Sequence, residues 1–244
     1  MMRPMRFHGE PLSWDFSPIE ALRRWPSDLG VLMLHSGRAD PTWSRYTILT
    51  TATGAYRYDG DDESDGRGAW LGEPAGSPGG DEPWPKGPMR GLERAFSDRD
   101  AMWLGYLSYD LGRSIEKLPG AAVDDRGWPI VQMHRCPGWL VHDNQTSRWT
   151  ACGTWHGGKS AGMPDLSRLP PIEHTFEADE PVALINRAAH EAAVAKAIDY
   201  IGAGDVFQVN LTQRFTSMFR GETRALYESL AHESPAWYGA YLEL

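Results

Sequence analysis

The chain has 244 residues and a mass of 27.2 kDa, with 41% hydrophobic and 11% aromatic residues. These values are enough for one large or two small folded domains, and they exclude a disordered chain. The net charge of −9 offers no basic surface for nucleic acid or anionic lipid, and no apolar run reaches the roughly 18 residues of a membrane span. We therefore expect a folded, soluble protein that binds neither nucleic acid nor membrane.

The N-terminus gives no sign of export. Basic residues precede Phe7, but no apolar stretch follows them, as a secretory signal requires. In a protein without such a signal we expect the two cysteines, Cys136 and Cys152, to stay reduced. The sequence therefore predicts a cytoplasmic protein.

A capped helix and a hairpin are predicted first along the chain. The run Ser17–Glu20 offers a capping serine, a proline at the first helical position and a glutamate that can return the capping hydrogen bond, and Pro26 ends the helix. Two short β-rich runs at 31–34 and 46–51 enclose a polar turn, which is typical of a hairpin. Gly, Pro, Asp and Glu dominate residues 59–91, where we expect a long loop.

Further strands and a linker complete the first half of the chain. Apolar and aromatic runs predict strands at residues 101–109, 130–134, 138–142 and 149–154. The Gly-, Ser- and Pro-rich stretch 157–171 predicts a flexible linker. Residues 153–160 match the phosphate-binding pattern G-x-x-x-x-G-K-S, but the prolines that follow leave no room for the helix that such a site needs. The linker is therefore the favoured interpretation.

The pattern beyond the linker is helical at first. Asn186 is typical of a helix start, and Gly202 and Gly204 of its end. Residues 206–215 then alternate between apolar and polar, which predicts a strand with one packed face and one polar face. A short helix near 222–232 leads to an apolar strand at 238–244. Because a domain rarely stops on such a strand, we expect the chain to be truncated.

Three arginines are candidates for binding a carboxylate. Arg45, Arg113 and Arg214 stand beside small polar residues at an element end or on a polar strand face, where a forked guanidinium can hold a carboxylate. Salt bridges within the protein explain such arginines equally well, and both interpretations stay open. The acidic run 59–65 lacks the glycine and distal glutamate of a calcium loop, which favours a solvated loop.

Several stretches resemble component I of aminodeoxychorismate synthase, in the family that also holds anthranilate synthase component I. In the first half they are His35–Asp40, Trp43–Tyr46 and Gly105–Arg113 with Glu116, and in the second half Tyr200–Ile201, Gly204–Phe215 and Pro235–Leu242. The stretch Gly204–Phe215 is the most specific of them. The resemblance runs from Val31 to Leu244, apart from the loop 59–91 and the linker.

The resemblance implies an α+β fold, the sheet-and-helix sandwich of anthranilate synthase. A mainly β N-terminal domain would span residues 1–175, and residues 176–244 would begin an incomplete chorismate-binding domain. The whole enzyme would convert chorismate to 4-amino-4-deoxychorismate for p-aminobenzoate and folate synthesis, with Mg²⁺ and with ammonia from a glutaminase subunit. The sister family makes anthranilate for tryptophan. Its loop usually reads Leu-Glu-Ser where this chain has His35-Ser36-Gly37, and this difference favours the aminodeoxychorismate enzyme.

The family's metal-binding glutamates and its catalytic lysine and histidine belong to later motifs that this chain lacks, so we expect no catalytic residue or metal ligand here. The resemblance does imply a pocket for tryptophan or another effector between the hairpin and the last strand. Its residues would be Ser36, Trp43, Ser44, Arg45, Tyr46, Tyr238, Gly239 and Ala240. Serine hydroxyls suit an amino acid's charged groups, and aromatic rings suit an indole.

One departure from the family pattern and two alternative interpretations stay open. Trp237 stands where the family usually has proline, which alters the expected shape of the pocket. The pocket residues would also be explained if they only pin the hairpin in place. A different class of function is a non-catalytic module that binds an amino acid and regulates a partner.

Overall fold

The computed structural model describes residues 7–38, 40, 42–60, 67–72, 77–80, 82–118, 123–155 and 162–244. Its contacts divide the chain into two compact units. Unit 1 consists of Met1–Ile172 and Glu228–Leu244, and unit 2 of Glu173–Tyr227. The sequence pattern predicts a boundary at residue 175, whereas the contacts also return the last residues of the chain to unit 1. The two units are described separately below.

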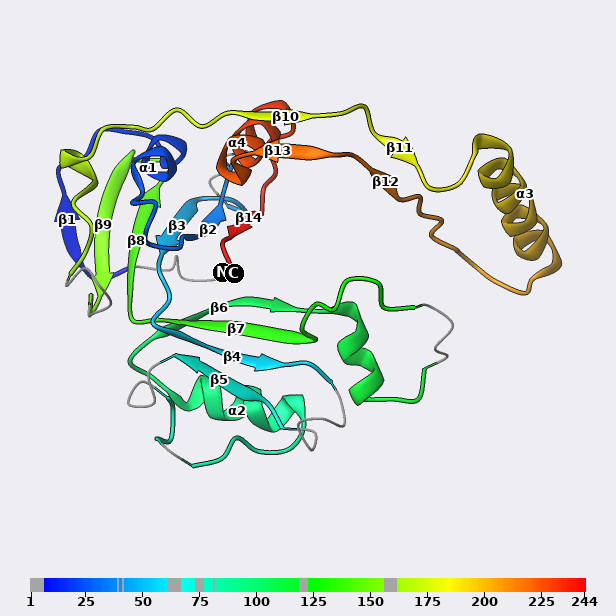
Figure 1. Cartoon of the computed structure of the whole chain (residues 1–244), viewed down its shortest axis with the longest axis horizontal. Coiled ribbons are helices and arrows are strands. Elements are labelled where there is room, and N and C mark those ends of the chain that lie inside the picture. Colours follow the sequence, from blue (N-terminus) through cyan, green and yellow to red (C-terminus); the bar gives the residue numbers. More distant parts are fainter. Residues whose placement is uncertain are drawn as a thin grey trace. The chain divides into compact units, whose positions relative to one another are not determined.

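In the described part of unit 1, one antiparallel sheet has six strands in the order β1-β9-β8-β3-β2-β14 (Figure 1). Their bounds are Glu10–Leu12 (β1), Arg148–Gly153 (β9), Gly138–Asp143 (β8), Tyr46–Thr50 (β3), Leu32–His35 (β2) and Gly239–Leu242 (β14). The predicted hairpin is confirmed, because Leu34 pairs with Ile48. The last strand of the chain pairs antiparallel with β2. This pairing brings two parts of the chain together that are far apart in sequence.

The first helix begins and ends where the sequence predicts. α1 spans Pro18–Arg24, and the Ser17 hydroxyl accepts a hydrogen bond of 3.1 Å from the Glu20 amide. The expected return bond from Glu20 is wrong, since its carboxylate accepts from Arg24 one turn later, at 2.5 Å. An ion pair at this spacing is the electrostatically favoured use of a glutamate before an arginine.

Aromatic side chains before α1 fix the start of the chain against the first sheet. Trp14 and Phe16 pack against the buried ring of Trp149 in β9, at centroid distances of 5.9 and 6.1 Å. The Trp149 indole N–H donates to the Phe16 carbonyl at 2.9 Å. The buried indole therefore has its hydrogen-bond partner, as a polar group in a core requires.

A second antiparallel sheet in unit 1 has the order β5-β4-β7-β6 among the described residues. Its bounds are Ala69–Gly72 (β5), Gly54–Tyr58 (β4), Val131–Cys136 (β7) and Met102–Leu107 (β6), with the helix α2 at Pro88–Ser97. The fully buried Tyr56 of β4 stacks on Trp84 at 4.6 Å and packs with Leu92 of α2. A β-carbon at Gly91 would lie 2.0 Å from the Tyr56 hydroxyl, so only glycine allows this close approach.

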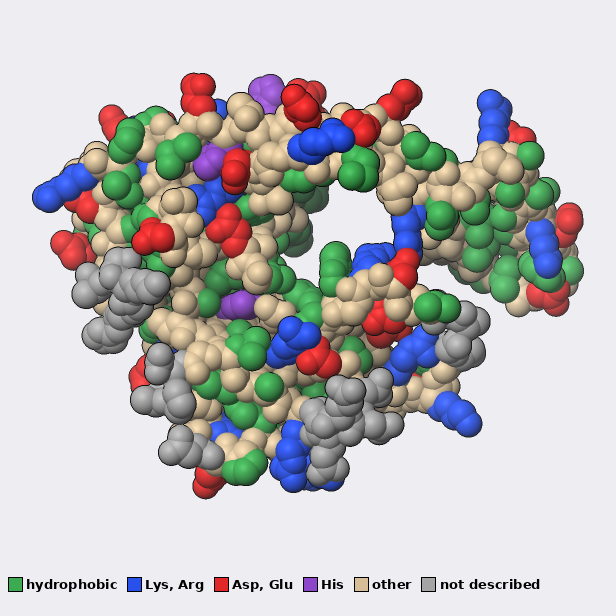
Figure 2. Space-filling view, viewed as in Figure 1, with side chains coloured by type: hydrophobic (Ala, Val, Ile, Leu, Met, Phe, Trp, Pro, Cys, Tyr) green, Lys and Arg blue, Asp and Glu red, His purple; other side chains and the backbone are tan. Residues whose placement is uncertain are grey.

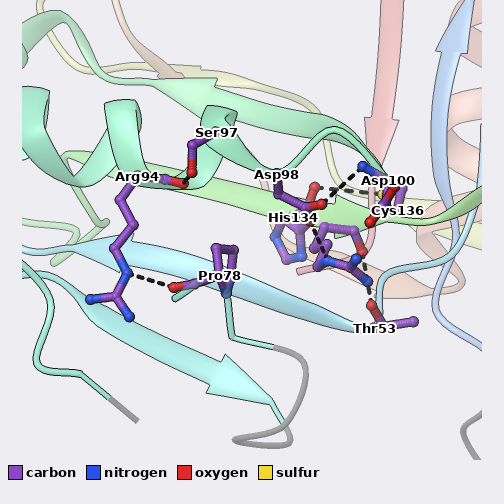
Figure 3. Close-up of polar contacts among 9 residues, drawn as sticks. Thr53, Pro78, Arg94, Ser97, Asp98, Asp100, His134 and Cys136 are labelled. Atoms are coloured by element: carbon purple, nitrogen blue, oxygen red, sulfur yellow. Dashed lines mark hydrogen bonds and ion pairs between the residues drawn. The ribbon is translucent and has the colours of Figure 1, made fainter. Parts of the chain in front are cut away.

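The prediction of a long loop over residues 59–91 is wrong in two places, at Ala69–Gly72 and from Pro88 onwards. β5 and the start of α2 fall within it, and Trp84 is buried. Arg94 of α2 donates to the Pro78 carbonyl at 2.5 Å (Figure 3). It also donates to the carbonyls of Glu82 and Pro83 at 2.9 Å. Although the segment is rich in Gly and Pro, Trp70 and Trp84 provide the apolar surface that packs it against the rest of the sheet. Residues 61–66 and 73–76, including most of the acidic run 59–65, lie outside the described residues.

The flexible-linker prediction is wrong for residues 162–171. Leu166 begins the short 3-10 helix η4 (Leu166–Arg168) and is fully buried. Arg24 of α1 donates to the Leu169 carbonyl at 2.7 Å, and the Ile172 amide donates to the Arg23 carbonyl at 3.0 Å. These contacts fasten the segment to α1. Residues 156–161, most of the phosphate-binding pattern, lie outside the described part of the chain.

Unit 2 contains paired short strands and a long helix. β10 (Phe176–Ala178) pairs with β13 (Phe219–Gly221), and β11 (Val182–Ala183) with β12 (Phe215–Thr216). α3 spans Arg187–Ala203, with Asn186 accepting from the Ala189 amide at 2.9 Å and Gly204 as a left-handed C-cap at φ +81°. The predicted start is therefore confirmed, and of the two predicted stop residues Gly204 ends the helix whereas Gly202 lies within it. α4 (Thr223–Glu233) follows β13, near the predicted 222–232.

The predicted strand over residues 206–215 is mostly wrong. Only Phe215 at its end enters a strand, and Phe207 is 95% exposed. A strand needs a neighbouring backbone to take its hydrogen bonds, and residues 206–214 have no ladder partner among the described residues. Alternation in the sequence alone does not supply that partner.

The described surface shows no large basic patch in the view of Figure 2, as the net charge of −9 leads one to expect. Acidic and basic side chains are interspersed on the face of unit 1 that Figure 2 shows. No described helix combines the length and apolarity that a bilayer crossing demands. Both cysteines are free and buried, and burial raises the pKa of the Cys136 thiol to about 12.

Candidate functional site

The predicted effector residues come from two segments that the first sheet brings together. One is the connection between β2 and β3, residues 36–45, which we call the hairpin loop. The other is residues 235–238 before β14, which we call the strap. Antiparallel pairing sets Gly239 opposite His35 and Ala240 opposite Leu34. This register puts the hairpin loop and the strap at the same end of neighbouring strands.

Direct contacts join the hairpin loop to the strap. The Ser44 hydroxyl donates to the Trp237 carbonyl at 2.8 Å, and the Arg38 amide donates to the Ala236 carbonyl at 2.9 Å. The Arg38 guanidinium lies over the Trp237 ring, 5.6 Å from its centre. Between them is an open pocket of about 400 Å³, lined by Arg38, Pro235, Ala236, Trp237 and Tyr238. A cation beside an aromatic wall suits a small ligand that carries a carboxylate and an apolar group.

The hairpin loop is held by its own polar groups. The buried Ser36 donates its hydroxyl hydrogen to the Tyr46 carbonyl at 2.7 Å, and its amide donates to the Thr47 hydroxyl at 3.1 Å. Asp40 and Ser44 exchange backbone hydrogen bonds of 3.2 Å across the tip. Both serine hydroxyls therefore donate within the protein. Both serines are buried, and neither lines the pocket beside the strap.

Arg45 is engaged by a carboxylate of the protein itself. Its Nε and terminal nitrogen contact the two oxygens of Asp143 at 3.0 and 2.5 Å, and its guanidinium lies 4.9 Å from the centre of the Tyr46 ring. This fork raises the pKa of Arg45 and lowers that of Asp143. Arg113 similarly contacts Asp110 at 2.8 Å. The sequence left open whether Arg45 and Arg113 bind a ligand carboxylate or form salt bridges within the protein. In the structure both form such salt bridges.

The remaining predicted residues differ in exposure. Trp43 and Tyr238 are 62% and 69% exposed, so their rings are accessible from solvent. Tyr46 is half-buried in β3 and meets Phe7 edge to face at 5.0 Å. The site prediction omits Arg38, Pro235 and Ala236, which line the pocket beside the strap, and of the predicted residues Tyr238 lines it. Arg38 lies within the run His35–Asp40, which carries the resemblance.

Behind the hairpin loop lie two histidines without net charge at neutral pH. Burial, with a smaller effect of His142, lowers the pKa of His35 to about 4. Burial also lowers the pKa of His142, against the opposing effects of its hydrogen bond to Asn144 and of the Asp143 charge. The His142 ring packs on Trp149 at 4.9 Å. Because the lowered pKa values keep His35 and His142 neutral, the positive charge that lines the pocket comes from Arg38.

The described residues do not form a site for the expected Mg²⁺. In the parts of the chain that the structure describes, no three His, Cys, Asp or Glu side chains come close enough together to hold a metal ion. Divalent magnesium needs carboxylate and other oxygen ligands that converge. The metal therefore stays a prediction for the whole enzyme.

Comparison with known proteins gives the family. Residues 53–244 match the protein-family model described as chorismate binding enzyme. The chain belongs to the chorismate-binding enzyme family. It is 34% identical over 151 residues to anthranilate synthase component 1 of Cereibacter sphaeroides, covering 54% of this chain and 30% of that protein. It is 29% identical over 164 residues to aminodeoxychorismate synthase component 1 of Bacillus subtilis, covering 61% of this chain and 34% of that protein.

A solved structure supports the fold of this chorismate-binding family member. The crystal structure of anthranilate synthase component I from Streptococcus pneumoniae matches with a TM-score of 0.56 and 18% identity, covering 97% of this chain and 54% of that chain. The expected α+β fold of the anthranilate synthase type is thereby confirmed. The chain spans about a third of the curated relatives and about half of the solved one.

Proposed function

We propose that the whole protein containing this chain is component I of aminodeoxychorismate synthase. It would aminate chorismate at C4 to give 4-amino-4-deoxychorismate for p-aminobenzoate and folate synthesis, using Mg²⁺ and ammonia from a glutaminase subunit. The observation that carries the proposal is the sequence His35-Ser36-Gly37 at the end of β2 and the start of the hairpin loop, which resembles this enzyme more than its sister. The similarity to the Bacillus subtilis enzyme supports it.

Anthranilate synthase component I is the second candidate. Its support is the similarity to the Cereibacter sphaeroides protein, which has the higher identity of the two relatives. The two reactions differ in their products, because only anthranilate formation releases pyruvate from chorismate. A measurement of pyruvate therefore separates them.

The test supplies the full-length protein with chorismate, Mg²⁺ and an ammonium salt, and separates the products by chromatography. We expect aminodeoxychorismate, with neither anthranilate nor pyruvate. Anthranilate with an equal amount of pyruvate would instead establish the second candidate. Turnover by the 244-residue chain alone would contradict the prediction that its catalytic groups lie elsewhere.

For the pocket beside the strap, we propose that it binds an amino-acid effector, with tryptophan as the expected ligand. Arg38 can pair with the carboxylate, and the Trp237 ring offers a wall for the indole. Calorimetry of the full-length protein with tryptophan tests this. We expect Arg38→Met to weaken binding by about tenfold, the loss typical of a charged hydrogen bond, and Arg126→Met on the same unit to leave it unchanged.

A further inference from the structure

The turn between β8 and β9 is closed by local hydrogen bonds and contacts the hairpin loop. The Asp143 carbonyl accepts from the amides of Thr146 at 3.2 Å and Ser147 at 2.8 Å, and the Asp143 carboxylate accepts from the Gln145 amide at 3.0 Å. Ser147 adopts a left-handed φ of +53° to complete the turn. These local bonds hold Asn144 within the turn, and the Asp143 carboxylate also forms the ion pair with Arg45 at the end of the hairpin loop.

Asn144 makes three hydrogen bonds from this turn. Its side-chain amide donates to the Ser36 carbonyl at 3.0 Å, and its backbone amide donates to the Arg45 carbonyl at 2.9 Å. Its side-chain carbonyl lies 2.6 Å from Nδ1 of His142. Ser36 and Arg45 are the first and last residues of the hairpin loop. One residue therefore bridges both ends of that loop.

The donors and acceptors fix how Asn144 is oriented. The Ser36 carbonyl can only accept, so the NH₂ group of Asn144 must face it. The Asn144 oxygen then faces His142 and can only accept, so Nδ1 of His142 must carry the hydrogen. The lowered pKa of His142 agrees with a neutral ring protonated at Nδ1. The His142 ring thus holds the side chain of Asn144 in the orientation that reaches Ser36.

The pairing of β2 with β3 does not by itself hold the ends of the hairpin loop, because this ladder runs only from Leu32–Thr50 to Leu34–Ile48. The flanking residues are held by other pairings, of His35 with Gly239 and of Tyr46 with Asp143. The loop ends themselves are held by the bonds of Ser36 to β3, by the ion pair of Arg45 with Asp143 and by the bonds of Asn144. A loop with loose ends would spend part of its time in arrangements that separate Arg38 from the strap. Affinity for a ligand falls in proportion to the fraction of molecules in the competent arrangement.

We propose that Asn144 is a positioning residue of the effector pocket, acting by clasping the hairpin loop that holds the strap. It touches no residue of the strap in any contact described above, and its effect passes through Ser36 and Arg45 to Arg38 and Ser44. The ligand part of this inference rests on the proposed effector function. The clasp itself can be tested without a ligand.

The test compares variants of the full-length protein. Asn144→Ala removes both side-chain bonds, whereas Asn144→Asp keeps an acceptor for His142 but cannot donate to Ser36. Gln145→Ala is the matched control in the same turn. Ser17→Ala removes one capping bond elsewhere in unit 1 and controls for general destabilisation.

Hydrogen–deuterium exchange measures the clasp, and calorimetry with tryptophan measures the pocket. In both Asn144 variants we expect the amides of residues 36–45 to exchange about tenfold faster and tryptophan to bind about tenfold more weakly, the loss of roughly one hydrogen bond. Neither change should occur in Gln145→Ala or Ser17→Ala. By ¹⁵N NMR, His142 should keep its Nδ1 hydrogen in Asn144→Asp and lose that preference in Asn144→Ala.

Two results would overturn the inference. One is unchanged exchange of residues 36–45 in both Asn144 variants, and the other is faster exchange with tryptophan affinity equal to that of the parent. If the parent itself does not bind tryptophan, the effector proposal fails, and the exchange and NMR results decide the role of Asn144 without it.

Discussion

Leu166 offers a sharp test of whether residues 162–172 are packed structure. Its side chain is fully buried in a segment whose composition predicts a free linker. The hydrogen bonds from Arg24 to Leu169 and from Ile172 to Arg23 fasten the segment beside it. If this packing is real, removing the leucine side chain must leave a cavity.

We expect Leu166→Ala to lower the free energy of unfolding by about 2–3 kcal/mol, the lower part of the range for buried leucines. The lower part applies because an irregular segment can partly collapse into the space. In a domain of roughly 150–250 residues this loss lowers Tm by roughly 4–12 °C.

Urea unfolding followed by tryptophan fluorescence measures the loss. The matched control is Leu230→Ala in α4, whose side chain is 56% exposed, and its stability should stay within about 0.5 kcal/mol of the parent. A Leu166→Ala protein as stable as this control would refute the reasoning, because the segment would then contribute no buried apolar surface.

Three further outcomes are expected. Gly91→Ala should cost about 1–3 kcal/mol of stability in thermal unfolding, because the added methyl group meets the buried Tyr56 hydroxyl; an unchanged Tm contradicts this packing. Because the pKa of His35 is lowered to about 4, the unfolded state binds its proton first as pH falls below about 6.5, and stability falls from there towards pH 4. In urea titrations at pH 7 and pH 5, His35→Gln should lose less unfolding free energy between the two pH values than the parent does. An equal loss in both proteins would contradict the lowered pKa of His35. Burial raises the thiol pKa of Cys136 and Cys152, so a thiol reagent at pH 8 should modify them in urea and not in the native protein; rapid native labelling excludes their burial.

The pocket residues were predictable as types but not in their partners. Ser36, Ser44 and Arg45 stand in a recognisable run of the sequence, yet their hydroxyl hydrogens and guanidinium are used within the protein. Arg38 lies in such a run, but nothing in the sequence indicates its contact with the strap, and Asn144 lies outside every such run. An arginine in a polar loop and an asparagine in a turn are common, and their roles depend on which distant backbone they meet.

The sequence by itself determined the elements whose causes are local. Ser17, Asn186 and Gly204 set helix ends because a cap acts within a few residues of itself, and alternating apolar side chains set the strands of the hairpin. These signals act over one turn of helix or one strand. They need no information from the rest of the chain.

Only the tertiary structure decided which of these elements meet. It placed β14 beside β2, buried Leu166 in a stretch rich in proline and glycine, and left residues 206–214 without a neighbouring strand among those described. Each outcome depends on hydrogen bonds and apolar contacts between segments far apart in the chain. Composition and periodicity report what a segment can form, whereas burial and pairing depend on the partner that the fold brings to it.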